Sequence, residues 1–417
     1  MGHLITIDKT KINEVLSRGV EQILPNKGSL LELMTQRPIR LYLGIDPTGS
    51  LLTLGHSVGL RKLNQFAQLG HEVILLIGSG TVKIGDPTGR DSTRPELTDE
   101  QIEANFKNWK EQASKVLDFD KIQIRYNGDW LDKMRLPDFI KLMAKTTVSQ
   151  LLERDMFVNR MKKNQPIFTH ELMYPLLQGY DSVAMDVDLE IGGTDQTFNM
   201  LMGRHLQKIY NQKEKWVLTT PIINGLDGRK MSKSYGNFIA LTENHLDMYG
   251  KLMRLSDDQI TEYFTLLTDT PLKEIKQMDQ AVKAGANPME FKKKLAFTIT
   301  QMYHNQKLAQ EAAEHFEKTV QQKQAPKTLI EVEVKDNQRL LDICRVCAND
   351  LSSAEIKRLI KQKGVTLYPQ EIRPDDINFK VNLSLNHTLR IGKRRWYRLV
   401  KKRWKASYDP QTKRASG

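Results

Sequence analysis

Lysine and histidine side chains that could bind a polyphosphate stand in two short stretches that are far apart in the sequence. The first stretch, residues 43–57, reads LGIDPTGSLLTLGHS and completes an apolar run. Its turn of Asp, Pro, Thr and Gly leads into a helix that we expect to begin near Gly55 and His56. Glycines let a ligand approach the backbone, and a helix N-terminus attracts an anion. The stretch therefore predicts a phosphate-binding turn, although an ordinary strand-to-helix turn can have a similar composition.

The second stretch, GRKMSKSYGN at residues 228–237, sets Lys230 and Lys233 three residues apart among serines and glycines. A mobile loop with two lysines can close on a triphosphate and neutralise charge that develops in a transition state. Two lysines at this spacing also occur on ordinary solvated loops. Only the two stretches together favour nucleotide chemistry.

A third polar group lies in the segment YPLLQGYD, which places Tyr174, Gln178 and Asp181 at positions i, i+4 and i+7 of an expected helix. These positions share one helix face. A face packed into the core would be apolar here, so three polar side chains indicate a polar ligand. A Gln and an Asp can bind an α-ammonium group and a phenolic hydroxyl. The segment GGTDQ, residues 192–196, follows.

Strand-like and helical patterns alternate from Ile39 to Thr220 and provide the elements that must position these groups. Strands are expected at residues 39–45, 72–78, 121–126, 187–193 and 215–220. Helices are expected at about residues 55–69 and after a capping box at Thr98 and Gln101. This alternation predicts an α/β fold with a Rossmann-like, doubly wound parallel sheet, which binds ligands at the carboxyl ends of its strands.

Two further domains are expected after the sheet. Helical periodicity at residues 247–255, 257–267, 288–303 and 307–322 predicts an all-helical domain, followed by a polar linker at residues 321–327. The last module is a short α/β domain. Its expected elements are helices at residues 340–347 and 352–363, the second capped by Ser352 and Glu355 and ended by Gly364, and strands at residues 365–368 and 389–392.

The net charge of +13 is concentrated near the C-terminus. Residues 326–417 contain 21 Lys and Arg against 10 Asp and Glu, whereas residues 1–325 contain 42 against 40. A basic module on a nearly neutral body indicates a polyanionic partner that one end of the chain binds. A solvated basic tail is the alternative, and composition does not distinguish the two.

The two cysteines, Cys344 and Cys347, form a CxxC pair, which can be half of a zinc site or a redox pair. The sequence has no second Cys or His pair beside it and no thioredoxin-like pattern around it, so two reduced helix cysteines are the favoured interpretation. Reduced cysteines indicate a reducing compartment, most simply the cytoplasm. The sequence shows no apolar run long enough to cross a membrane and no signal-peptide pattern, so we expect no membrane partner.

The motifs TLGH (residues 53–56) and KMSKS (residues 230–234) together resemble the two signatures of class I aminoacyl-tRNA synthetases, in the right order and separation. The set YxxQxxD plus GGTDQ is similar to that of the tyrosyl-tRNA synthetases within this class. The resemblance covers the whole chain and includes a C-terminal segment, about residues 339–399, that is similar to S4 RNA-binding domains.

The resemblance implies a tyrosine–tRNA ligase that makes tyrosyl-adenylate from tyrosine and ATP, releases pyrophosphate and transfers the tyrosyl group to tRNA(Tyr). ATP would be a substrate accompanied by Mg²⁺, with no tightly bound metal site in the protein. The expected domains are a Rossmann-like catalytic domain (1–225), the KMSKS loop with a helical anticodon-binding domain (226–325) and an S4-like domain with a basic tail (330–417). A cytoplasmic homodimer formed through about residues 130–175 is also implied.

The resemblance further implies a role for individual residues. Tyr42 and Asp181 would contact the phenol hydroxyl of tyrosine; the remaining residues of the tyrosine site would be Asp46, Thr81, Asp86, Tyr174, Gln178 and Gln196. The catalytic groups would be Thr48, His56, Lys230 and Lys233, and ATP would be bound by Gly55, His56, Asp195, Lys230 and Lys233. RNA would be bound by Lys393, Arg394, Arg395 and Arg398.

One position departs from the pattern of the family, because Thr53 occupies the place of the first His of the HxGH signature. A Thr hydroxyl is shorter than an imidazole and neutral, and losing one such donor costs about 3–4 kcal/mol in a transition state. Thr48, Ser50 or a closed lysine loop could compensate, or activation could be slow. This departure leaves one rival hypothesis, a synthetase-like RNA-binding protein with weakened or lost catalysis. A metal or redox protein based on the CxxC pair is a further alternative.

Overall fold

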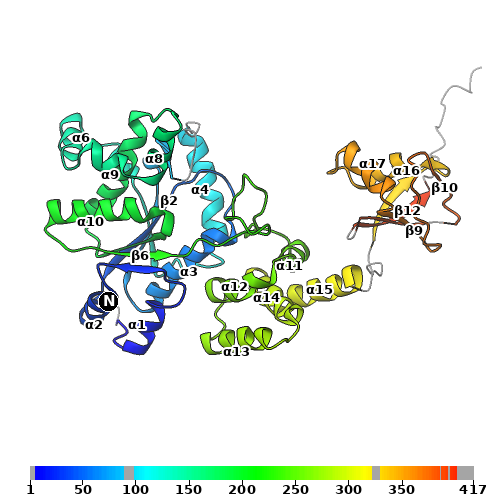
Figure 1. Cartoon of the computed structure of the whole chain (residues 1–417), viewed down its shortest axis with the longest axis horizontal. Coiled ribbons are helices and arrows are strands. Elements are labelled where there is room, and N and C mark those ends of the chain that lie inside the picture. The colour runs from blue at the N-terminus through cyan, green and yellow to red at the C-terminus, as the bar shows by residue number, and fades with distance from the viewer. Residues whose placement is uncertain (1–4, 89–97, 322–328, 386, 393–394, 402–417) are drawn as a thin grey trace, which may run out of the picture. The chain divides into compact units, whose positions relative to one another are not determined.

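The computed structural model describes residues 5–88, 98–321, 329–385, 387–392 and 395–401. The chain divides into two compact units, the first ending at Ala309 and the second beginning at Gln310. Figure 1 shows both units with many of their elements labelled. Apart from Gln321, the expected linker lies outside the described residues.

A six-stranded sheet with the order β1-β6-β5-β2-β3-β4 forms the centre of the first unit. Its neighbouring strands are parallel except for β1 and β6. The parallel strands confirm the predicted doubly wound sheet. The strands are β1 (Gln22–Leu24), β2 (Arg40–Ile45), β3 (Glu72–Ile77), β4 (Ile122–Tyr126), β5 (Leu189–Gly193) and β6 (Trp216–Thr220).

Helices cover both faces of this sheet (Figure 1). Successive side chains of a strand point to opposite faces: on β2, Tyr42 contacts Ser182 of α9 (Thr169–Met185). Its neighbour Leu43 packs on α3 (Leu54–Gln68), where a Cβ on Gly59 would lie 3.2 Å from it. Helix α10 (Thr197–Asn211) lies against α9. The other helices of this part are α1 (Lys9–Val15), α2 (Lys27–Gln36), α4 (Asp99–Ala113), α5 (Gly128–Leu131), α6 (Leu136–Met143), α7 (Val148–Leu152) and α8 (Asp155–Lys162).

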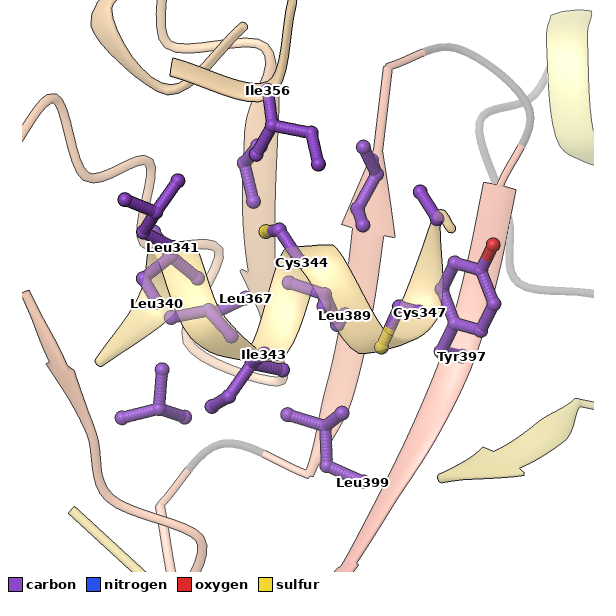
Figure 2. Close-up of a cluster of buried hydrophobic side chains, with 14 of the residues drawn as sticks. Leu340, Leu341, Ile343, Cys344, Cys347, Ile356, Leu367, Leu389, Tyr397 and Leu399 are labelled. Atoms are coloured by element: carbon purple, nitrogen blue, oxygen red, sulfur yellow. The ribbon is translucent and has the colours of Figure 1, made fainter. Parts of the chain in front are cut away.

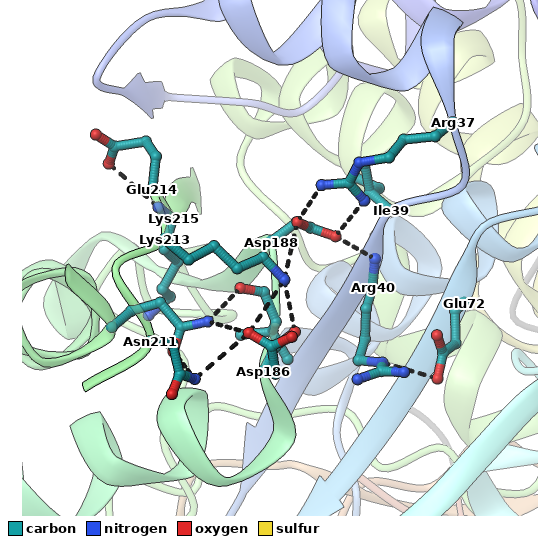
Figure 3. Close-up of polar contacts among 12 residues, drawn as sticks. Arg37, Ile39, Arg40, Glu72, Asp186, Asp188, Asn211, Lys213, Glu214 and Lys215 are labelled. Carbon is teal, nitrogen blue, oxygen red and sulfur yellow. Dashed lines mark hydrogen bonds and ion pairs between the residues drawn. The ribbon is translucent and has the colours of Figure 1, made fainter. Parts of the chain in front are cut away.

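A buried carboxylate joins β2 and β5 at their amino ends (Figure 3). Asp188 accepts two hydrogen bonds from the Arg37 guanidinium, at 2.6 and 3.0 Å, and one from the backbone N–H of Arg40 at 2.8 Å. Lys213 lies 3.1 Å away. Burial opposes ionisation, but these contacts outweigh it and hold the pKa of Asp188 below its usual value. The contacts align two neighbouring strands that are far apart in the sequence.

Helices α11 (His245–Leu252), α12 (Ile260–Leu267), α13 (Leu272–Lys283), α14 (Pro288–Tyr303) and α15 (Gln306–Phe316) follow the sheet. The helical character expected after residue 240 is confirmed, although α13 was not expected. Arg18 connects this region to the sheet region. Its guanidinium donates hydrogen bonds to carbonyls at the end of α12, including those of Phe264 and Thr268 at 3.1 and 2.7 Å. The Phe264 carbonyl also accepts a hydrogen bond from the backbone N–H of Thr268 at 3.3 Å. The arginine therefore adds donors at the end of the helix, where carbonyls run short of partners, and fixes α12 against the segment that follows α1.

The second unit contains a sheet of order β7-β12-β11-β9 and a short β8–β10 pair. Helices α16 (Leu340–Cys347) and α17 (Ser353–Lys361) accompany the strands β7 (Ile330–Val334), β8 (Gln338–Arg339), β9 (Val365–Tyr368), β10 (Lys380–Val381), β11 (Thr388–Ile391) and β12 (Arg395–Lys401). Figure 2 shows its core, in which Cys344 and Cys347 of α16 point among leucines and isoleucines. Both cysteines are free thiols.

The expected end of α17 is wrong in one detail. Lys363, not Gly364, adopts the left-handed conformation, with φ of 56°. Gly364 allows a close approach, because a Cβ there would lie 3.1 Å from the carbonyl oxygen of Leu359. Among the described residues of both units, no helix is long and apolar enough to cross a membrane.

Candidate active site

A pocket of about 220 Å³ lies at the carboxyl ends of β2 and β5, where the strand order of the parallel sheet reverses. Doubly wound sheets bind their ligands at this switch point. The pocket brings together every residue that the sequence assigned to tyrosine: Tyr42, Asp46, Thr81, Asp86, Tyr174, Gln178, Asp181 and Gln196. Thr48 and His56 line it as well.

Asp46, which directly follows β2, accepts hydrogen bonds from two walls of the pocket. The Tyr174 hydroxyl donates to its Oδ2 at 2.8 Å, and the Thr81 hydroxyl donates to its Oδ1 at 2.8 Å. Gly78 makes this approach possible, because a Cβ there would overlap with the Asp46 carboxylate. Burial, with the charges of Asp46 and Asp86, raises the pKa of Tyr174 well above its usual value. Tyr174 is therefore a neutral donor that fixes the carboxylate.

Asp181 is buried in the pocket wall on α9. Trp130 Nε1 donates to its Oδ1 at 2.8 Å, and Asn127 Nδ2 donates to its Oδ2 at 3.1 Å. Burial raises the pKa of Asp181 well above its usual value, although both hydrogen bonds favour the carboxylate. A carboxyl group in such surroundings is a strong partner for a ligand hydroxyl, because little water competes for it.

Asp86 is held in place by two neighbouring side chains, one of which is bound by a third. Its Oδ2 accepts a hydrogen bond from Gln196 Nε2 at 2.7 Å, and its Oδ1 accepts one from the Thr88 hydroxyl at 2.6 Å. Arg154, which is buried, donates in turn to the Thr88 hydroxyl at 2.7 Å. The pocket thus presents the carboxyl groups of Asp46, Asp86 and Asp181 on different walls, as recognition of an ammonium group and a hydroxyl requires.

Thr53 is the N-cap residue of α3 and holds the ring of His56. The backbone N–H of Thr53 donates to His56 Nδ1 at 3.1 Å, and the Thr53 hydroxyl lies 2.8 Å from the same nitrogen. A backbone N–H can only donate, so Nδ1 is the acceptor and Nε2 carries the proton. Burial, then the charge of Lys233, lowers the pKa of His56 to about 4. His56 is therefore neutral at pH 7 and offers an Nε2–H donor.

The KMSKS loop, residues 228–237, meets the turn at the start of α3. Lys233 Nζ lies 3.4 Å from the position that a Cβ on Gly49 would occupy. The backbone N–H of Gly55 donates to the sulfur of Met231 at 3.2 Å, so this sulfur now covers the glycine that the sequence assigned to ATP. The two stretches that sequence analysis paired are neighbours in space.

Lys230 and Asp195, which sequence analysis assigned to ATP, bind each other. Lys230 Nζ donates to Asp195 Oδ2 at 2.8 Å, and both side chains are partly exposed. Neither of them, nor Gly55 or Lys233, lines the pocket itself. An incoming triphosphate would have to compete with Asp195 for Lys230.

The residues assigned to RNA lie on the second unit where they are described. Arg395 and Arg398, both on β12, pair with Asp350 at 2.6 Å and with Glu331 at 3.6 Å. These pairs are exposed, so they are weak and exchangeable. Lys393 and Arg394 lie outside the described residues.

Four residues in or behind the pocket were missed by sequence analysis. Asn127 and Trp130 bind Asp181 from the segment after β4, which has no periodic pattern. Glu190 lines the pocket from the buried strand β5 and forms an ion pair with Lys215. A charged residue inside an apolar strand is a signal for a buried partner or ligand, and Glu190 could have been found in this way.

Comparison with known proteins identifies the family. The family model described as "tRNA synthetases class I (W and Y)" matches residues 34–321. The chain belongs to this family. It is 43% identical to a tyrosine–tRNA ligase of Thermotoga maritima over 93% of this chain and 96% of that protein. It is 40% identical to a tyrosine–tRNA ligase of Aquifex aeolicus over 93% and 97%, respectively.

Comparison with solved structures shows the same fold. A tyrosyl-tRNA synthetase of Archaeoglobus fulgidus, solved with L-tyrosine, matches 73% of this chain and all of its own length, with a TM-score of 0.60 and 20% identity. A truncated mitochondrial tyrosyl-tRNA synthetase of Aspergillus nidulans matches 73% of this chain and 92% of that one, with a TM-score of 0.63 and 21% identity.

Proposed function

We propose that this chain joins tyrosine to tRNA(Tyr), as a tyrosine–tRNA ligase that forms tyrosyl-adenylate from tyrosine and ATP. The observation that carries the proposal is the pocket at the strand-order switch, in which carboxyl groups on separate walls are held by buried donors. Relatives that are called tyrosine–tRNA ligases, and that this chain matches over nearly their whole length, support it. They support the enzyme, not the rival hypothesis of an RNA-binding protein without catalysis.

Tyrosine would bind in the pocket with its ring between β2 and α9. Asp181 and Tyr42 would contact the phenol hydroxyl. Asp86, Tyr174 and Gln178 would hold the ammonium group, and the remaining assigned contacts would come from Asp46, Thr81 and Gln196. The geometry suits this arrangement, because Asp46 is already fixed by Tyr174 and Thr81.

ATP would bind over the turn and the start of α3. The tyrosine carboxylate attacks the α-phosphate in line; a carboxyl–phosphate bond forms, and the bond to pyrophosphate breaks. No protein nucleophile is needed, because the enzyme acts by positioning and by stabilising charge. Thr48, Lys230 and Lys233 would bind the phosphates, His56 Nε2–H would donate to the nucleotide, and Asp195 would contact the ribose once Lys230 releases it.

Magnesium would accompany ATP as part of the substrate. The carboxylates near the pocket are already bound by donors, and the described residues contain no group of three or more His, Cys, Asp or Glu side chains that could hold a metal ion. This donor set fits a metal held by the phosphates better than a resident ion. When bound, magnesium would neutralise phosphate charge.

The remaining assignments complete the proposal. Residues 1–225 would form the catalytic domain, 226–325 the loop and anticodon-binding helices, and 330–417 the RNA-binding domain, with Arg395 and Arg398 contacting phosphates. A homodimer would form through about residues 130–175. Its support is a run of exposed apolar side chains, with Leu136, Ile140 and Val148 exposed by 70%, 52% and 62%. The protein would act in the cytoplasm.

The test of this function is aminoacylation of tRNA(Tyr) with labelled tyrosine and with labelled phenylalanine. We expect tyrosyl-tRNA and strong rejection of phenylalanine, by about 10⁴–10⁵, a range that rests on enzymes of this same kind. Asp181→Ala should reduce this discrimination. If Asp181→Ala left the selectivity unchanged, the assignment of the tyrosine pocket would be wrong.

A further inference from the structure

Asn199, in the first turn of α10, is a fully buried amide that does not itself line the pocket. Its side-chain oxygen finds no hydrogen-bond partner among the described residues. A buried polar atom without a partner costs free energy that an apolar side chain of similar shape would not. The presence of an asparagine here therefore calls for a function of its amide nitrogen.

The amide nitrogen of Asn199 donates to two glutamines that do line the pocket. Nδ2 donates to Gln178 Oε1 and to Gln196 Oε1, each at 2.9 Å. Both hydrogens of the nitrogen are used in this way. Asn199 thus holds the oxygen ends of two amides that come from different elements, α9 and the turn after β5.

Each glutamine is held at its nitrogen end by a carboxylate. Gln178 Nε2 donates to Glu190 Oε1 at 3.0 Å, and Gln196 Nε2 donates to Asp86 Oδ2 at 2.7 Å. A carboxylate only accepts hydrogen bonds, so neither amide can turn round without placing its oxygen against another acceptor. Asn199 and the two carboxylates therefore fix the direction of both amides.

This direction suits a positively charged ligand group. An ammonium group only donates hydrogen bonds, so it needs oxygen atoms with free lone pairs. Gln178 Oε1 uses one lone pair for Asn199 and keeps the second. An amide that turned round would present N–H groups to the ammonium and repel it. The second acceptor that we assign to the ammonium, Asp86, is connected to Asn199 through Gln196.

We propose that Asn199 is a positioning residue for recognition of the α-ammonium group of the amino acid. It presents the oxygen of Gln178 directly and supports the carboxylate of Asp86 through Gln196. The inference rests on the proposed function and concerns only the ammonium end of tyrosine.

The probe for this role is 3-(4-hydroxyphenyl)propanoate, which is tyrosine without the ammonium group. Its affinity is measured by competition with tyrosine in titration calorimetry of the full chain. Asn199→Leu and Asn199→Ala each remove the two donated hydrogens. We expect either variant to weaken tyrosine binding about ten- to hundredfold, as for hydrogen bonds to a charged group, and to change the affinity for the analogue less than about twofold.

Pyrophosphate exchange gives a second, independent measurement. Ammonium contacts hold tyrosine in both the ground state and the transition state. The KM for tyrosine should therefore rise in the Asn199 variants, while kcat at saturating tyrosine and the KM for ATP change little.

Gln207→Met is the matched control, because Gln207 is another fully buried amide of α10. Its Nε2 donates to Asp186 Oδ1 at 3.1 Å and to the carbonyl oxygen of Val187 at 3.0 Å, and it does not line the pocket. This variant should leave the ratio of the two affinities and the KM for tyrosine unchanged.

A merely structural role of Asn199 would weaken tyrosine and the analogue by the same factor, and this result would overturn the inference. So would Asn199 variants that bind tyrosine as the parent does, or a fall in kcat without a rise in the KM for tyrosine. A parent protein that binds no tyrosine would instead overturn the proposed function and the inference with it.

Discussion

The hydroxyl oxygen of Thr53 lies 2.8 Å from Nδ1 of His56, and the backbone N–H of the same threonine donates to that nitrogen at 3.1 Å. Thr53, which departs from the HxGH signature, therefore has a contact of its own in the site. It is buried at the N-cap of α3 and fixes the tautomer of the remaining histidine. Because His56 is neutral, it contributes a directed N–H donor rather than a charge.

The first prediction concerns this contact. Thr53→Ser keeps the hydroxyl and should leave the rate of tyrosine activation within about twofold of the parent. Thr53→Val keeps the shape but loses the hydroxyl, so we expect activation to fall about three- to tenfold, as for the loss of one hydrogen bond. Tyrosine affinity should change little in both variants, because we assign His56 to the nucleotide and not to tyrosine.

Single-turnover measurements of adenylate formation separate these expectations. Thr53→His tests the hypothesis drawn from the signature alone. If threonine only weakens catalysis, the rate of adenylate formation in the histidine variant rises by up to about 10²–10³-fold. If threonine is part of the mechanism, as its contact with His56 indicates, the histidine variant is slower than the parent. A Thr53→Val variant as fast as the parent would contradict our account of the hydroxyl.

The second prediction concerns pH. His71 is buried and accepts a backbone hydrogen bond from Ile39 through Nδ1 at 3.4 Å; burial lowers its pKa to about 4. Between pH 6.5 and 4 the unfolded state binds a proton that the folded state does not, so the free energy of unfolding falls as the pH falls. At pH 5 this costs on the order of 2 kcal/mol relative to pH 7.5.

His71→Asn keeps an acceptor for Ile39 but does not titrate. We therefore expect a smaller loss of stability between pH 7.5 and pH 5 in this variant, measured as the shift in urea midpoint. His56 titrates in the same direction and is present in both proteins, so the difference isolates His71. If the urea midpoint shifted equally in the parent and the variant between pH 7.5 and pH 5, His71 would not be the group that titrates.

The third prediction concerns the CxxC pair. Burial raises the pKa of both Cys344 and Cys347 to about 12. The thiolate is the reactive form, so iodoacetamide at pH 8 should leave the folded protein unmodified and label both cysteines after unfolding in urea. Mass spectrometry reads the labelling. Rapid modification of the folded protein would contradict this prediction and favour a redox role for the pair. A bound zinc ion would favour a metal role.

Strands could be predicted from the sequence where the strand itself carries a clear apolar pattern. The runs that became β2 and β3 are apolar and bounded by turn residues, so their positions could be predicted within about a residue. β1 has three residues and shows no period. β12 carries Arg395, Arg398 and Lys401 among its apolar residues, so charge obscured its alternation.

The site was predictable where a helix face or a motif carries it. Tyr174, Gln178 and Asp181 share a face of α9 that periodicity identifies. Glu190 and Lys215 meet because β5 and β6 pair in parallel with Leu189 opposite Trp216, and this register is a tertiary fact that neither strand reveals alone. The same holds for Trp130, which reaches Asp181 from another segment.

The fourth prediction concerns the basic second unit. Removing residues 330–417 should leave tyrosyl-adenylate formation nearly intact, because the pocket lies wholly in the first unit. Charging of tRNA should weaken, and the tRNA affinity of the intact chain should fall steeply with salt as phosphate contacts are screened. Filter binding at several salt concentrations, with charging assays of both proteins, provides the measurement. A truncated protein that charges tRNA as well as the intact one would contradict this.

The central claim is that this pocket activates tyrosine with ATP, and pyrophosphate exchange tests it most directly. The purified chain with magnesium, ATP and labelled pyrophosphate should form labelled ATP when tyrosine is present and not when phenylalanine replaces it. His56→Ala and Lys233→Ala should each depress the exchange with little change in tyrosine affinity, because we assign their contacts to ATP. Tyrosine-dependent exchange is the result that our account predicts; RNA binding without any exchange would contradict it.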